Sequence, residues 1–124
     1  GSIVNVGSMW AKQAVKATPS TAYSMQKAGL HSLTQHLAME LADDNIRVNA
    51  VSPAVVETPV FNGVFGGEEE AKKGLKGFNA FHPIGRIGTP EDISNSILFL
   101  LSDKSSWITG AILDTDGGIM AGRN

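Results

Sequence analysis

The chain contains no cysteine, and this absence excludes disulfide bridges and metal sites built from thiolates. It is also compatible with a reducing compartment, so we expect a cytoplasmic protein. Long hydrophobic runs are absent as well. The longest wholly apolar segment, Ile97 to Leu101, is far too short to cross a bilayer, and no charged and then apolar leader opens the chain. We therefore expect no membrane partner.

An excess of positive charge is also lacking. The chain has 10 lysine and arginine residues against 12 aspartate and glutamate residues, which gives a net charge of −2 at pH 7. Because phosphate binding needs clustered lysine and arginine, nucleic acid is not an expected partner. His31 and His36 are five residues apart on an expected helix, and His82 is distant in sequence, so no metal site is predicted.

What the chain does contain is an alternation of strands and helices. The 124 residues suffice for a single domain, 1–124, and 42% of them are hydrophobic. The predicted strands are Ile3–Val6, Ile46–Val51 and Ala111–Asp114, and the predicted helices are Ser20–Asp43 and Thr89–Asp103. This order predicts an α/β fold, a partial Rossmann-type parallel sheet of three strands flanked by helices. The brevity of the first strand suggests a central, buried position.

The predicted helix at Thr89–Asp103 has a well-defined start. Thr89 can cap it, Pro90 suits its first position, and acidic residues fill its first turn, where the helix dipole favours them. The preceding segment, residues 54–89, is rich in glycine, glutamate and lysine with isolated apolar residues. We interpret this segment as a mobile insert of short helices.

The predicted helix at Ser20–Asp43 has two usable faces. Leucines recur at spacings of three and four along a stripe that a sheet can cover, namely Leu30, Leu33, Leu37 and Leu41. A second, milder face carries Met25, Gly29, Ser32 and His36. Small residues on this face permit close approach of another helix, so we expect the first face against the sheet and the second against a partner.

Tyr23 and Lys27 lie four residues apart in the first turns of that helix, so their side chains share one face. A phenol beside a cation ionises more easily and can then exchange a proton near neutral pH. Such a pair also arises by chance, and Ser8 by itself is more simply a turn serine. Ligands, however, bind at the carboxyl ends of parallel strands, where Ser8 and the start of this helix are both expected. The three residues together therefore favour catalysis.

Five segments, in order, resemble the C-terminal half of the classical short-chain dehydrogenase/reductase family. They are GSIVNVGS, AYSMQKAG, IRVNAVSPAVVETP, HPIGRIGTPEDI and ITGAILDTDGG, and together they cover nearly the whole chain. Each segment is weak by itself, whereas the ordered combination is specific. The resemblance implies a Rossmann-type sheet, NAD or NADP as cofactor, a small carbonyl or alcohol substrate, and usually a homodimer or homotetramer.

The resemblance also implies roles for individual residues. Ser8 would position the substrate oxygen, Tyr23 would exchange the proton, and Lys27 would favour the ionised tyrosine while binding the nicotinamide ribose. The implied cofactor-binding residues are Tyr23, Lys27, Pro53, Val56 and Thr58. Among them, Thr58 and the backbone of Val56 would meet the nicotinamide carboxamide.

The chain departs from the family in two ways. Ala54 stands where the family has glycine, which is tolerable only if φ there is negative. A full family member is about twice as long, and its other half carries the glycine-rich turn that binds the pyrophosphate. Without that half, the strand at Ile3–Val6 would become an edge.

Two interpretations of the function remain open. The chain is either the catalytic and substrate-binding half of an NAD(P)-dependent oxidoreductase, inactive by itself, or a non-catalytic interaction module derived from that family. In both cases we expect a homo-oligomer, built through the helix at 20–43 and through the last helix and strand.

Overall fold

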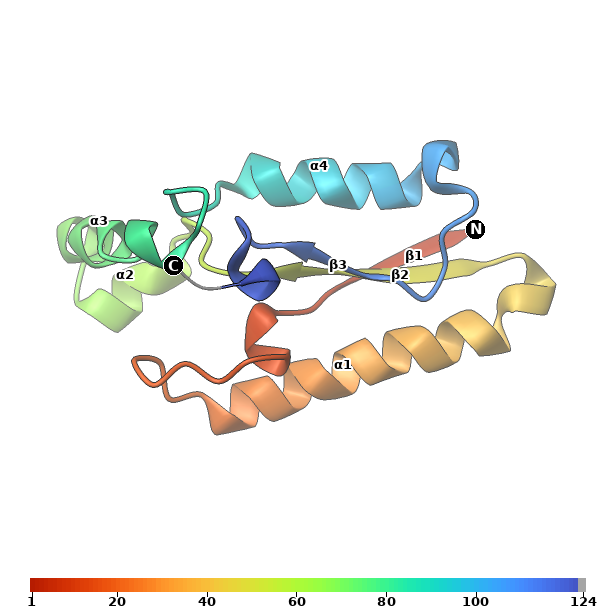
Figure 1. Cartoon of the computed structure of the whole chain (residues 1–124), viewed down its shortest axis with the longest axis horizontal. Coiled ribbons are helices and arrows are strands. Elements are labelled where there is room, and N and C mark those ends of the chain that lie inside the picture. The colour runs from red at the N-terminus through yellow and green to blue at the C-terminus, as the bar shows by residue number, and fades with distance from the viewer. Residues whose placement is uncertain (123–124) are drawn as a thin grey trace.

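The computed structural model describes residues 1–122. Its strands are β1 (Ser2–Val6), β2 (Arg47–Pro53) and β3 (Ile112–Thr115), and its α-helices are α1 (Thr21–Glu40), α2 (Val60–Phe65), α3 (Glu68–Lys76) and α4 (Pro90–Leu101). Five short 3-10 helices connect them: η1 (Met9–Ala11), η2 (Ala42–Asp44), η3 (Asn79–Phe81), η4 (Asp103–Ser105) and η5 (Ile119–Ala121). In Figure 1 the sheet lies between α4 above and α1 below.

The sheet confirms the predicted α/β fold with three parallel strands. Its order is β1-β2-β3, and Val51 of β2 pairs with Val6 on one side and Leu113 on the other. Residues 48–52 of β2 are all buried, whereas β1 is only partly covered. The central position suggested for the first strand is therefore wrong for the described part of the chain, because β1 has a neighbour on one side only. The edge position expected without the other half is confirmed.

Helix α1 covers one face of the sheet, and its burial differs from the predicted leucine stripe. The residues buried against the sheet are His31, Thr34 and Ala38, while Leu33 is 48% exposed. Asn5 of β1 donates a hydrogen bond to the hydroxyl of Thr34 at 3.0 Å. Small and polar residues thus line the centre of the contact, whereas Leu30, Leu37 and Leu41 are only partly covered. The predicted bare face is exposed, including Met25, Gly29, Ser32 and His36.

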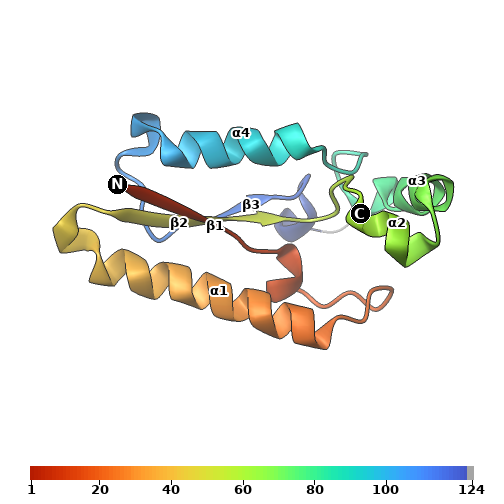
Figure 2. The same cartoon turned by 180° about the vertical axis from the view of Figure 1, so that it is seen from behind.

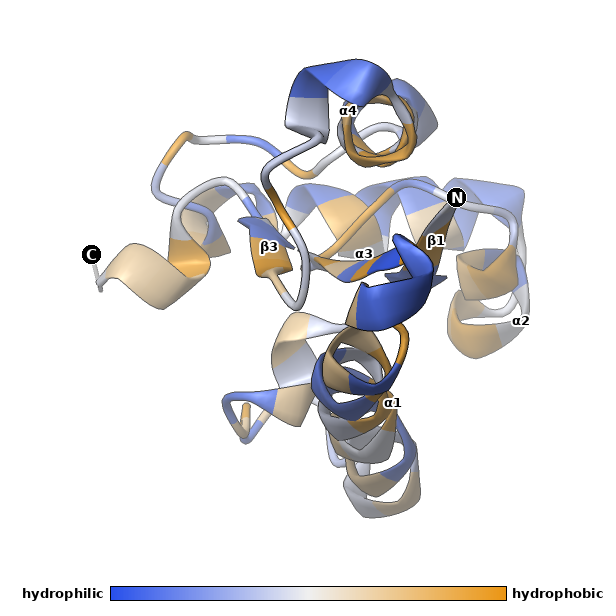
Figure 3. Cartoon of the chain, turned by 90° about the vertical axis from the view of Figure 1, so that its right-hand side faces the viewer, coloured by the Kyte–Doolittle hydropathy of each residue, from blue (hydrophilic) through white to orange (hydrophobic). Residues whose placement is uncertain are grey.

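Helix α4 covers the opposite face, as the end-on view in Figure 3 shows. Its predicted start is confirmed: the Thr89 hydroxyl accepts the Asp92 N–H, and the Asp92 carboxylate accepts the Thr89 N–H. At its other end, the guanidinium of Arg47 donates to the carbonyl oxygens of Leu100 and Ser102. A cation interacts favourably with the free carbonyl groups at the C-terminal end of a helix. Arg47 therefore joins α4 to the central strand, β2.

The segment 54–89 forms the short helices that its composition predicts. Helices α2 and α3 lie beyond the carboxyl ends of the strands, at the same end of the molecule in Figures 1 and 2. The Phe65 ring of α2 occupies the space that a Cβ at Gly74 of α3 would need, which shows that the two helices pack closely. The mobility of this segment stays a prediction. In residues 1–122, no helix combines the length and the apolar character that a membrane span requires.

Candidate functional site

The carboxyl ends of the three parallel strands lie at one edge, and each strand is followed by a turn with candidate residues. Val6 leads into the Gly7–Ser8 turn, and Pro53 ends β2 just before Val56 and Thr58. The N-terminal end of α1 lies toward the same side of the molecule in Figures 1 and 2. Parallel topology therefore gathers the predicted residues at the edge where ligands bind in such sheets.

Ser8 is the N-cap of η1 and is only 2% exposed. Its Oγ accepts a hydrogen bond from the backbone N–H of Trp10 at 3.1 Å. Within residues 1–122, no group accepts a hydrogen bond from the Ser8 hydroxyl, so its proton is available for a ligand oxygen. A hydroxyl held in this way has a fixed position, which suits a group that orients a substrate.

Tyr23 and Lys27 lie on one face of α1. Lys27 Nζ is 5.7 Å from the centroid of the Tyr23 ring, and it donates a hydrogen bond to Val6 O at 2.8 Å. Tyr23 is 46% exposed. Lys27 thereby joins the helix that carries the phenol to the strand that leads into Ser8. An ammonium within about 6 Å of an aromatic ring is attracted to its face, which further fixes the pair.

The turn after β2 presents its backbone. Val56 forms a parallel bridge with Gly88, in which Glu57 N donates to Gly88 O and Gly88 N donates to Val55 O. No partner in residues 1–122 bonds the N–H or the C=O of Val56 itself. One free donor and one free acceptor on a single residue fit a carboxamide, which carries both groups. Ala54 does not have a positive φ, so the condition for replacing the family's glycine is met.

His82 fixes this second turn. It is 2% exposed, its Nε2 accepts a hydrogen bond from Val55 N at 3.3 Å, and its Nδ1 lies 2.8 Å from Phe78 O. A nitrogen that faces a carbonyl oxygen must carry the proton, so the ring is the Nδ1–H tautomer. Sequence reasoning missed this role, because nothing in the sequence shows that residues 55 and 82 are adjacent.

His31 fixes the first turn in a similar way. It is 8% exposed on α1, and its Nε2 accepts a hydrogen bond from the backbone N–H of Ser8 at 3.1 Å. Burial is the main cause that lowers the pKa of His31; Lys12 and Lys27 lower it further, whereas Asp114 opposes them. Sequence reasoning also missed this contact. The available signal was spacing, since His31 follows Lys27 by one helical turn on the same stripe.

An ion pair joins the segment that precedes helix α4 to the first turn of that helix. Arg86 donates to both carboxylate oxygens of Asp92, at 2.6 and 3.2 Å. This hydrogen bonding, together with the N–H of Thr89, holds the pKa of Asp92 well below its usual range. The same contact raises the pKa of Arg86. The pair ties residue 86 to the start of α4 and so helps to fix the bridge at Gly88.

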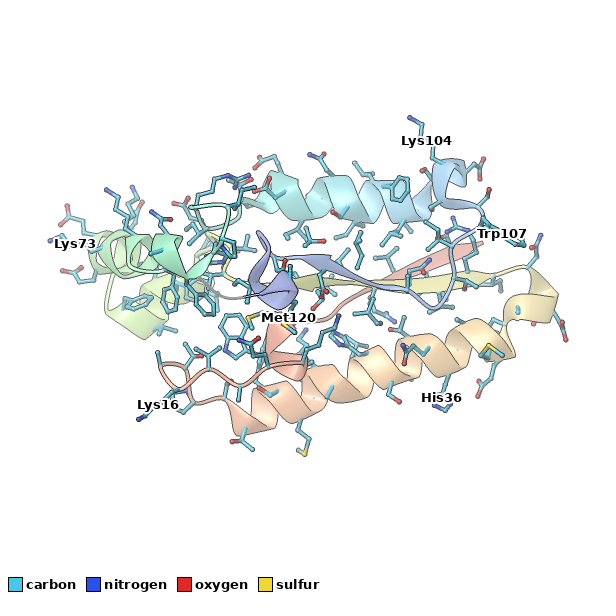
Figure 4. The ribbon with its side chains drawn as sticks, viewed as in Figure 1. Lys16, His36, Lys73, Lys104, Trp107 and Met120 are labelled. Carbon is cyan, nitrogen blue, oxygen red and sulfur yellow. The ribbon has the colours of Figure 1, made fainter. Side chains whose placement is uncertain are left out.

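A cleft of about 690 Å³ lies beside this bridge. Its lining includes Val56, Asp92, Asp114 and Met120, the last of which is labelled in Figure 4. None of Ser8, Tyr23 and Lys27 lines it, so this cleft and the three candidate catalytic residues are separate features. Residues 1–122 contain no group of histidine and carboxylate side chains suited to a metal ion.

Comparison with known proteins gives one consistent result. The family model for "Enoyl-(Acyl carrier protein) reductase" matches residues 1–120. Galactitol 2-dehydrogenase of Rhizobium johnstonii is 43% identical over 118 residues, which cover 95% of this chain and 44% of that protein. An oxidoreductase of the short-chain dehydrogenase/reductase family from Burkholderia thailandensis has a similar structure, with a TM-score of 0.83 and 37% identity over 99% of this chain and 45% of that one.

A third similar protein carries a cofactor. ElxO with NADP bound has a TM-score of 0.86 and 29% identity, over 98% of this chain and 47% of that one. In all three cases the chain spans less than half the length of the protein that it matches.

Proposed function

The chain belongs to the short-chain dehydrogenase/reductase family, and on this premise we propose that it is the catalytic half of an NAD(P)-dependent oxidoreductase. The substrate would be a small alcohol or carbonyl compound. One observation carries the proposal: Lys27 lies beside the Tyr23 ring and bonds Val6 O, at the end of the strand that leads into Ser8.

In the proposed mechanism, three side chains act on one substrate oxygen. During reduction a hydride adds to the carbonyl carbon and negative charge grows on the oxygen. Ser8 donates a hydrogen bond to that oxygen, and Tyr23 transfers its proton to it as the alcohol forms. The Lys27 ammonium then stabilises the phenolate that remains. Oxidation of an alcohol follows the same steps in reverse.

We further propose that the backbone N–H and C=O of Val56, in the turn that follows Pro53, hold the nicotinamide carboxamide together with Thr58. Tyr23 and Lys27 would hold the ribose. NAD and NADP both supply or accept the hydride when bound, and nothing in these contacts distinguishes them, because both carry the same nicotinamide end. The pyrophosphate lies outside these contacts.

Fusion to a complete relative tests the proposal. The chain is joined behind the N-terminal half of galactitol 2-dehydrogenase, and hydride transfer is followed by the absorbance of NADH or NADPH with a panel of small alcohols and ketones. We expect turnover in the fusion. We expect no binding of either cofactor to the chain by itself at micromolar concentration in calorimetry, because the phosphate contacts are missing. Micromolar binding to the chain itself would contradict the half-site proposal.

The second candidate function is a non-catalytic module that assembles with copies of itself. Large apolar side chains are exposed near the last helix and strand, namely Leu98, Phe99, Leu101, Trp107 and Leu113. Trp107 is 99% exposed, and in Figure 4 it lies at the end of the sheet near the N-terminus. Exposed apolar surface of this kind stabilises self-association. The length of the encoding reading frame separates the two candidates, because a frame of about twice this length would remove the reason for a separate module.

We propose a homo-oligomer in either case, formed through α1 and through α4 with β3. On the bare face of α1, Gly29 has no atom within 4 Å of where a Cβ would lie, and His36 points away from the sheet in Figure 4. Gly29→Arg or His36→Glu should weaken a contact formed there. Light scattering at tens of micromolar decides the matter, since a 13.0 kDa monomer would refute the oligomer.

A further inference from the structure

His31 is a buried titratable group that the proposed chemistry does not use. It follows Tyr23 by two helical turns and Lys27 by one, so one stripe of α1 carries a phenol, an ammonium and an imidazole. Its Nε2 accepts the backbone N–H of Ser8 at 3.1 Å, across 23 residues of sequence. The helix that carries two candidate catalytic side chains thus also contacts the backbone of the third.

The imidazole packs directly on the turn. A Cβ built on Gly7 would clash with Nε2 and Cδ2 of His31, so only glycine admits the ring at this distance. On the other side, Gly7 N donates to Val51 O at 2.8 Å, which continues the pairing of β1 with β2. The Gly7–Ser8 turn is therefore held between the central strand and the His31 ring.

The contact requires one protonation state of the ring. A nitrogen that accepts a hydrogen bond carries no proton, so His31 is neutral, with its proton on Nδ1. Three charged groups act on it from three elements: Lys27 on α1, Lys12 beside η1 and Asp114 on β3. Lys12 and Asp114 are themselves paired at 2.7 Å, which leaves Lys27 as the charge with no carboxylate partner in residues 1–122. This arrangement favours the neutral ring that the contact needs.

Building on the function proposed above, we propose that His31 is a positioning residue, whose neutral imidazole holds the Ser8 backbone so that the Ser8 hydroxyl stays directed at the substrate oxygen. Protonation of Nε2 replaces the acceptor with a donor that faces the Ser8 N–H. The turn then loses this support, and Ser8 loses its fixed position. The effect belongs to the acid side of pH 6.5, the ordinary pKa of histidine.

Nuclear magnetic resonance of the 124-residue chain tests the contact without any assay of activity. At about pH 7.5 we expect the nitrogen shifts of His31 to show the Nδ1–H tautomer, with Nε2 as an acceptor. As the pH is lowered, the Ser8 amide proton should shift with the same midpoint as the His31 ring. An Nε2–H tautomer, or a Ser8 amide that ignores the titration of His31, would overturn the proposal.

Two variants and a control sharpen the test. In His31→Gln the side-chain oxygen can accept from Ser8 N and does not titrate, so the Ser8 amide should stay protected and lose its pH dependence. In His31→Leu its hydrogen exchange should be about tenfold faster, because the acceptor is lost. Gln35→Leu, an exposed position on the same helix outside its proposed oligomer contact, should change neither. Equal hydrogen exchange of the Ser8 amide in the Gln and Leu variants would contradict the positioning role of His31. If His31→Leu does not fold, the His31→Gln variant and the tautomer of the native His31 ring test the role instead.

The fused enzyme separates the role of His31 from the proposed function. His31→Gln should leave kcat at neutral pH unchanged and should flatten the acid side of the pH profile of kcat. His31→Leu should lower kcat by a larger factor than it raises KM. An unchanged acid limb in His31→Gln would count against the positioning role. A fusion that never turns over, with the tautomer and the Ser8 shift as expected, would overturn the oxidoreductase function and leave the contact established.

Discussion

Two turns at the same edge of the sheet are each held by a buried histidine, and the two histidines differ in their surroundings. His31 accepts the Ser8 N–H from a separate long helix, with three charged groups close enough to influence it. His82 accepts the Val55 N–H, and its second nitrogen is bonded to Phe78 O one helical turn earlier. Among residues 1–122, the first imidazole has a hydrogen bond on one nitrogen, whereas the second has one on each.

The difference corresponds to what each turn presents. The Gly7–Ser8 turn presents a hydroxyl, and α1 contacts this turn and the end of β1 through His31 and Lys27. The turn after β2 presents the backbone N–H and C=O of Val56, which need a fixed frame and no charge. The proposed site would thus separate side-chain chemistry at the first turn from backbone recognition at the second.

The largest effect should follow from removing the phenolic proton at the first turn. In the fused enzyme, Tyr23→Phe should lower kcat by about 10²- to 10⁴-fold, because proton transfer to the substrate oxygen is lost. Cofactor affinity, measured by calorimetry, should fall far less than kcat, since Lys27 and the turn after β2 are untouched. Gln35→Leu, at an exposed position on the same helix, serves as the control. Retained turnover in Tyr23→Phe would remove the phenol from the mechanism.

Gly7→Ala should break the support of the first turn. The new Cβ would meet the buried His31 ring, and overpacking of this kind costs about 1–3 kcal/mol of unfolding free energy. Gly63→Ala is the matched control, because a Cβ there meets nothing within 4 Å and alanine should stabilise α2 by about 1 kcal/mol. Urea unfolding of both variants measures the contrast. Equal stabilities would show that the ring and Gly7 are not in close contact.

The second turn is tested at His82. His82→Leu leaves the buried N–H of Val55 without an acceptor, which should cost about 1–3 kcal/mol of unfolding free energy. His82→Gln keeps an acceptor and should lose less. In the fused enzyme both variants should raise KM for the cofactor with a smaller change in kcat, opposite to the pattern expected for His31→Leu. A matching kcat loss at His82 would show that the two turns do not have separate roles.

The smallest effect should come from the ion pair between Arg86 and Asp92, which helps to fix the turn after β2. Since the pKa of Asp92 is lowered in the folded state, its contribution is present above the ordinary aspartate pKa of 3.8 and is lost as the pH falls below it. Asp92→Asn should therefore lower the melting temperature slightly at pH 7, and the difference from the native chain should shrink in acid. A difference that is constant over this pH range would assign the effect to helix capping instead.

Much of the fold follows from local patterns in the sequence. The strand predicted at Ile46–Val51 is observed at Arg47–Pro53, two residues further at its end, and the start of α4 at Thr89–Pro90 lies where its capping residues predict it. The pattern of buried residues within α1 does not follow from such local patterns. The spacing of the leucines points to one stripe, whereas Thr34 and Ala38 are the residues that face the sheet, because Asn5 supplies Thr34 with a polar partner across the contact.

By itself, the sequence determined the order of elements and predicted Ser8, Tyr23 and Lys27 as a group, because hydrophobic period, capping and helical spacing act over a few residues. Only the tertiary structure decided what holds that group and the turn after β2 in place. The contacts of His31 with Ser8, of His82 with Val55 and of Val56 with Gly88 join residues 23, 27 and 32 positions apart. Such contacts depend on how the strands and helices pack, and no local pattern in the chain encodes the partner of a buried imidazole.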